Sequence, residues 1–186
     1  MEKYLKRYIS LMFILLVGTI SYNAYHLTHA LAVNANIIKE YKEELIQYNN
    51  ENKKIDSNVV GIINIPKIKV QLPIINNTDK ETLRYNIGQY TNTSKLGETG
   101  NAVITSNSIF PGNYLLKDIN SLEKGDKVEI QNENGVYIYT VDDKIENNIP
   151  AVKSYDKNEK KRKLTIVLYE GLYKEDNKIE IIATSN

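Results

Sequence analysis

The chain of 186 residues contains no cysteine and no tryptophan, and it has only 9 glycines and 4 prolines. Without cysteine the protein can form no disulfide and perform no thiol chemistry, although both extracellular and cytosolic proteins can lack this residue. We read the scarcity of glycine, proline and tryptophan as compositional bias rather than function. Lys and Arg number 24 against 23 Asp and Glu, so the chain lacks the strongly basic balance typical of nucleic-acid-binding proteins.

The N-terminus carries a long apolar run behind a basic flank. Lys3, Lys6 and Arg7 precede an apolar segment over residues 8–25, which is near the lower length limit for spanning a bilayer. The basic flank predicts a cytoplasmic N-terminus with the remainder of the chain outside. The alternative is a cleaved signal peptide, because Ala30-Leu-Ala32 resembles a cleavage site. That site lies about ten residues beyond the apolar run, which favours an anchor over residues 1–26.

Residues 27–50 are expected to form an amphipathic helix, followed by a polar linker that ends at residue 58. Apolar residues with one central Asn recur at alternating spacings of four and three, as in a heptad seam. This stripe could pair with another helix, or it could dock on the protein's own folded domain, which we favour. The stripe consists of Leu27, Leu31, Asn34, Ile38, Tyr41, Leu45 and Tyr48.

From residue 59 to residue 186 the pattern changes to short β-rich stretches separated by turn residues. Asn134-Gly135 lies between two such stretches, a strong signal for a hairpin. One short helix is expected over residues 79–87, with Thr78 or Asp79 as its capping residue and Gly88 at its end. Many short strands with one or two short helices predict a closed barrel or a sandwich. The expected strands are residues 59–65, 68–72, 101–105, 127–130, 136–141, 163–169 and 178–183.

Several segments of this region, taken in order, resemble one known family. Residues 61–74 read GIINIPKIKVQLPI, which is similar to the opening of sortases, and residues 100–104 (GNAVI) resemble the stretch before the sortase histidine. Residues 122–130 resemble the family's "L..GD" turn and strand, and residues 164–169 (LTIVLY) resemble the strand that ends in its cysteine. The resemblance implies an eight-stranded sortase β-barrel outside the membrane.

The resemblance also locates the family's catalytic positions. Sortases are cysteine transpeptidases that join surface proteins carrying an LPxTG-like sorting signal to the wall or to a pilin. Asn107, Tyr169 and Lys178 stand where the family has His, Cys and Arg. Tyr is a poor substitute for a thiolate because its pKa lies near 10, and Asn cannot transfer a proton. His26 and His29 are the only histidines and lie at the end of the membrane segment, where a catalytic role is not expected.

The resemblance, with its altered catalytic positions, implies a pseudo-sortase that binds or scaffolds a partner. The expected partner is a sorting-signal peptide or the precursor of a pilin or surface protein, and an active sortase is a second candidate partner. No cofactor, no metal and no nucleic acid is expected. Two alternatives stay open: an enzyme with a Ser nucleophile and a Lys base, and an assembly factor that acts through the helix over residues 27–50. The residues expected to line the groove are Ser106, Asn107, Ser108, Thr165, Leu168, Tyr169 and Lys178.

Overall fold

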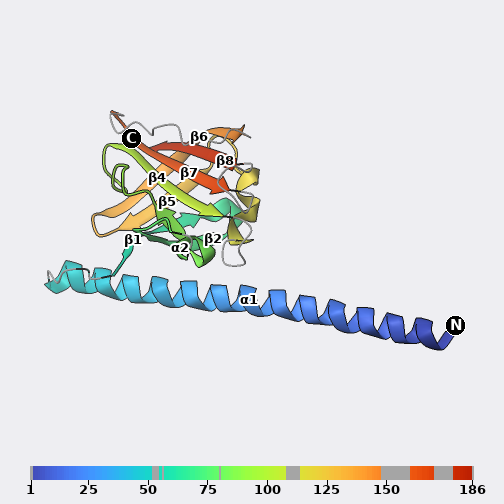
Figure 1. Ribbon diagram of the computed structural model, residues 1–186. Helices are drawn as coiled ribbons and strands as arrows, with labels where there is room; N and C mark the ends of the chain where they lie inside the picture. Colours follow the sequence, from blue (N-terminus) through green and yellow to red (C-terminus); the bar gives the residue numbers. More distant parts are fainter. Residues whose placement is uncertain are drawn as a thin grey trace.

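The structure, a computed structural model, describes residues 2–51, 55, 57–79, 81–107, 114–147, 160–169 and 178–185. A long helix, α1 (Glu2–Glu51), runs past a β-barrel that lies beside its C-terminal half (Figure 1). The barrel elements, in chain order, are β1 (Val59–Ile65), η1 (Pro66–Ile68), β2 (Val70–Ile75), α2 (Thr82–Tyr85), β3 (Ile87–Gln89), β4 (Gly100–Asn107), η2 (Tyr114–Ser121), β5 (Lys127–Asn132), β6 (Gly135–Asn147), β7 (Arg162–Tyr169) and β8 (Lys178–Ser185).

The strands close into a barrel in the order β1-β2-β3-β4-β7-β8-β6-β5, so each described strand has a neighbouring strand on both sides. Strands β2 and β3 are parallel, as are β4 and β7, whereas the other neighbouring pairs are antiparallel. The closed barrel and the hairpin between β5 and β6 are therefore confirmed. The helix expected over residues 79–87 is shorter, because Ile87 is fully buried and pairs with Ile74 as the start of β3.

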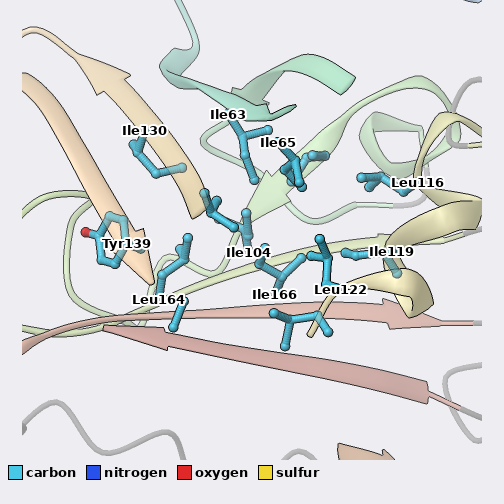
Figure 2. Close-up of a cluster of buried hydrophobic side chains, with 14 of the residues drawn as sticks. Ile63, Ile65, Ile104, Leu116, Ile119, Leu122, Ile130, Tyr139, Leu164 and Ile166 are labelled. Carbon is cyan, nitrogen blue, oxygen red and sulfur yellow. The ribbon is translucent and has the colours of Figure 1, made fainter. Parts of the chain in front are cut away.

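Alternate residues of the strands fill the barrel with aliphatic side chains. Figure 2 shows Ile63, Ile104, Ile130 and Ile166 directed into this interior. Side chains of η2 close one part of the same cluster, in which Leu116 and Ile119 are fully buried. The outer face of the barrel is therefore the side on which a binding site can form.

Helix α1 is one continuous helix, and its C-terminal half docks on the barrel. Ile38, Tyr41 and Leu45 pack against Val59 and Ile62 of β1. The docking interpretation of the apolar stripe therefore agrees with the structure. The predicted stripe was wrong in one respect, since its Leu31 is 44% exposed while the neighbouring residue Ala30 is fully buried.

Asn34, the polar residue of the stripe, is used to attach the helix to α2. Its side chain is only 3% exposed, and its Nδ2 donates a hydrogen bond of 3.3 Å to the carbonyl oxygen of Tyr85. The rings of His29 and Tyr85 lie 6.3 Å apart, centroid to centroid. The barrel side of the molecule therefore meets α1 at His29, about one helical turn after residue 25, where the apolar segment ends.

The N-terminal half of α1 extends past the barrel (Figure 1). It includes an 18-residue window that is apolar enough to cross a bilayer, and no part of this window is buried. Side chains such as Leu11, Phe13 and Leu15 are 60–69% exposed. This segment is a candidate membrane anchor, since so large an apolar surface is rarely left in water.

Candidate functional site

The three positions singled out in the sequence are neighbours in the barrel wall. Asn107 pairs with Tyr169 between the parallel strands β4 and β7, and Tyr169 pairs with Lys178 between β7 and β8. Residues opposite each other in a sheet point to the same face. Because their strand neighbours Leu168 and Ile179 belong to the interior cluster, Asn107, Tyr169 and Lys178 point to the outer face.

Tyr169 covers a small apolar area on this outer face. Its ring packs with Val103 and Val167, and the half-buried Tyr90 packs against the same cluster. The two tyrosine hydroxyls lie 3.4 Å apart, and Tyr169 is only 4% exposed. A ligand that is to contact Val103 or Val167 must therefore displace one of the two rings.

Lys178 forms an ion pair along its own strand. Its Nζ lies 2.6 Å from Oε1 of Glu180, and the two side chains are only 6% and 13% exposed. Residues two apart on a strand share a face, so this pair lies beside Tyr169 on the outside of the barrel. The Nζ of Lys178 therefore already has a carboxylate partner on this face of the barrel.

The remaining candidate groove residues do not gather around Lys178. Leu168 belongs to the interior cluster, and Ser106 pairs with it across β4 and β7, so both point away from the outer face. Thr165 is 2% exposed and donates a hydrogen bond of 3.0 Å to Oδ1 of Asn101. Ser108 lies outside the described residues.

These placements limit the chemistry that the described residues can perform. Ser106 and Lys178 lie on opposite faces of the sheet, so they cannot act together as nucleophile and base. Thr165 pairs with Ile182, four residues along β8 from Lys178, which corresponds to about 13 Å at the usual rise per residue. Within the described part of the chain, no group of His, Asp or Glu side chains is arranged to hold a metal ion.

Two residues of this site were missed in the sequence. Glu180 could have been found, since a Lys and a Glu two positions apart on a strand must share a face. Tyr90 could not have been found, because its contact with Tyr169 spans 79 positions of the chain. It results only from the pairing of β3, β4 and β7.

The site lies at the end of the barrel that faces the anchor. Figure 1 shows β4 and β7 running in the direction in which α1 extends toward its N-terminus. Asn107 and Tyr169 are the last residues of these two strands, and Lys178 begins the strand that returns. A bilayer around the N-terminal half of α1 would therefore lie on the side of the barrel where these three residues are found.

Comparisons with known proteins point to one family. A family model described as the sortase domain matches residues 63–179. Sortase D of Bacillus subtilis is 30% identical over 81 residues, and sortase A of Bacillus anthracis is 28% identical over 83 residues. These matches span 44% and 45% of this chain and 39% of each of those proteins.

Solved sortase structures share the fold. The Sortase D5 transpeptidase of Clostridium perfringens has a TM-score of 0.70 at 21% identity, covering 83% of this chain and 99% of that chain. Sortase C1 of Streptococcus agalactiae has a TM-score of 0.62 at 19% identity, covering 87% and 88%. The expectation of a sortase-like, closed eight-stranded barrel is confirmed.

Proposed function

The chain belongs to the sortase family, and we propose that it binds a polypeptide at the outer edge formed by Asn107, Tyr169 and Lys178 without cleaving it. The partner proposed is a surface-protein or pilin precursor that carries a sorting signal. The observation that carries this proposal is the placement of these three residues side by side on β4, β7 and β8. They occupy the positions where the resemblance places a catalytic His, Cys and Arg.

The absence of cleavage is supported by side-chain chemistry. The chain contains no cysteine, so no thiolate can attack a peptide carbonyl. Lys178 is paired with Glu180 at 2.6 Å, and Ser106 points to the other face of the sheet. These observations do not favour the alternative of a Ser nucleophile with a Lys base.

The alternative of an assembly factor acting through α1 is also not favoured. Ile38, Tyr41 and Leu45, the residues that would form the seam, are 9%, 1% and 5% exposed because they pack on the barrel. A partner helix could reach them only after α1 had left β1. The helix serves better as a fixed support for the barrel.

The proposed location is the plasma membrane of a Gram-positive cell, with a single membrane span, a cytoplasmic N-terminus and the barrel outside. The basic residues before the apolar segment support this orientation. The close docking of α1 supports a barrel held at the bilayer, with the proposed binding edge on its bilayer side. A polypeptide that emerges from the same membrane would meet this edge first.

Binding and cleavage can be tested separately with the full chain in neutral-lipid nanodiscs. We expect the wild-type protein to bind sorting-signal peptides of the LPxTG kind and to leave them uncut. Absence of binding at millimolar peptide would contradict the proposal. Cleavage by the wild-type protein would contradict the inactive part of it.

Restoring the family's residues provides a second test. We expect the thiol of the triple variant Asn107→His, Tyr169→Cys, Lys178→Arg to attack a peptide carbonyl, forming a thioester and releasing the C-terminal fragment of the peptide as an amine, both detected by mass spectrometry. The matched control carries Tyr169→Ala in place of Tyr169→Cys and has no thiol to acylate. If the triple variant is folded and binds no peptide, this edge of the barrel is not a substrate groove.

A further inference from the structure

A second concave surface extends from the outer face of β5 and β6 to the end of the barrel where β7 begins and β8 ends, and there it includes Tyr137, which packs against the interior cluster. The cavity has a volume of about 800 Å³. It shares no residue with the site around Tyr169 or with the surface that receives α1. Its lining residues include Lys127, Val136, Tyr137, Ile138, Lys161 and Arg162.

Exposed apolar side chains of the barrel gather at this cavity. Val136 is 61% exposed and Ile138 is 53% exposed. In the described part of the chain, every other large apolar side chain with comparable exposure belongs to α1. These two residues occupy adjacent outward positions of one strand, so their exposed apolar surfaces lie side by side.

Positive charge surrounds these apolar side chains. Among the described residues, Lys127, Lys161 and Arg162 line the cavity together with one carboxylate, that of Asp142. This carboxylate already accepts a hydrogen bond of 2.6 Å from the hydroxyl of Thr184. The cavity therefore has an excess of two positive charges, although the whole chain has a net charge of only +1.

The Arg162 side chain is held in place before any partner arrives. Its Nε donates a hydrogen bond of 2.8 Å to the carbonyl oxygen of Gly97, and its guanidinium carbon lies 5.5 Å from the centre of the Tyr137 ring. Gly97 has a φ of +84°, and a Cβ at this position would lie 2.3 Å from the same ring. The glycine thus permits the close approach that positions Tyr137 and Arg162 together.

We propose that this cavity is a docking surface for an acidic polypeptide segment that also carries apolar side chains. Arg and Tyr are typical anchors of protein interfaces, and an arginine that is already positioned loses little freedom on binding. An anionic polymer without apolar groups would pair with Lys127, Lys161 and Arg162 but leave Val136 and Ile138 in water. The charge complementarity and the exposed apolar pair together favour a polypeptide.

The test uses the full chain in neutral-lipid nanodiscs and a labelled dodecapeptide of alternating Glu and Leu. Fluorescence anisotropy at 150 mM salt should give a Kd of about 0.1 mM or tighter, and a peptide of alternating Lys and Leu should not bind. Absence of binding by the acidic peptide at 1 mM would overturn the proposal. Equal binding of the two peptides would do the same.

Exposed residues offer variants that spare the fold. We expect Lys127→Glu with Lys161→Glu to weaken binding of the acidic peptide at least about tenfold, whereas Lys39→Glu with Lys124→Glu, which changes the charge equally elsewhere, leaves it unchanged. Val136→Thr with Ile138→Thr keeps both residues β-branched and should also weaken binding about tenfold. Unchanged affinity in the threonine variant would overturn the apolar part of the proposal.

The same full chain and threonine variant distinguish two other possible occupants of the cavity. Binding of poly(glycerol phosphate) that exceeds binding of the acidic peptide, and that is insensitive to Val136→Thr with Ile138→Thr, would assign the surface to an anionic polymer instead. Dimerisation of the full chain that is abolished by the same variant, measured by analytical ultracentrifugation, would assign it to a second copy. Either result overturns the proposed partner.

Discussion

Replacing Glu180 with Gln keeps the shape of the side chain but removes the carboxylate that lies 2.6 Å from the Lys178 ammonium. Both side chains are almost fully buried, with exposures of 6% and 13%, so little water can take over the role of the carboxylate. Removing one partner of a buried ion pair usually costs about 3–5 kcal/mol of folding free energy. Lys178 has further interactions, so we expect about 3 kcal/mol, the lower end of that range.

The assay is reversible unfolding of the full chain in detergent, followed by near-ultraviolet circular dichroism of its tyrosines. Glu146→Gln is a matched control, because Lys144 and Glu146 form a pair with the same spacing on β6, 3.7 Å apart and with exposures of 31% and 60%. This control should lose at most about 1 kcal/mol, as exposed pairs do. The double variant Lys178→Met, Glu180→Leu should recover most of the stability that Glu180→Gln loses.

The reasoning is refuted if Glu180→Gln loses no more stability than Glu146→Gln. In that case the buried Lys178–Glu180 pair would contribute no more to stability than an exposed pair does. A double variant that is as unstable as Glu180→Gln would show that packing, not charge, determines the loss.

Three further results are expected. Leu45→Ala should weaken the docking of α1 on the barrel by about 2–3 kcal/mol. Hydrogen exchange should then accelerate in β1 while β7 remains protected, and equal acceleration in both strands would contradict the docking of α1 on β1 alone. Burial, with smaller contributions from Glu133 and Glu44, raises the pKa of Tyr41 above the usual value of 10. The stability that the neutral Tyr41 side chain contributes is therefore complete below pH 10 and declines as the pH rises beyond it. This alkaline loss should be smaller in Tyr41→Phe. Tyr169→Ala should cost about 3 kcal/mol but strengthen binding of sorting-signal peptides, since no ring must move; weaker binding would mean that the ring contacts the peptide.

Seven of the eight strands were readable in the sequence because each of these segments carries its own local signal, whereas β3 (Ile87–Gln89) was not predicted. The Asn134-Gly135 turn predicted the β5–β6 hairpin, and the resemblance of residues 164–169 placed Tyr169 at a strand end. The strand before Asn107 was expected to end at residue 105, but β4 continues to Asn107. The direction of the side chains in β7 was not readable. Residues 164–169 are buried on both faces of the sheet, so they show no alternation of apolar and polar residues. Leu168 was therefore expected in the groove although it lies in the core.

The sequence by itself determined that the chain has no thiol chemistry and that an apolar segment precedes the barrel, and its resemblance to sortases predicts that Asn107, Tyr169 and Lys178 stand at the family's catalytic positions. These properties depend on which residues are present and in what order. The tertiary structure decided that Tyr90 packs beside Tyr169 on the outer face, that Lys178 is buried with Glu180, and that a basic cavity with exposed apolar side chains lies on another side of the barrel. Such features depend on contacts between distant strands, and closure of the barrel creates those contacts.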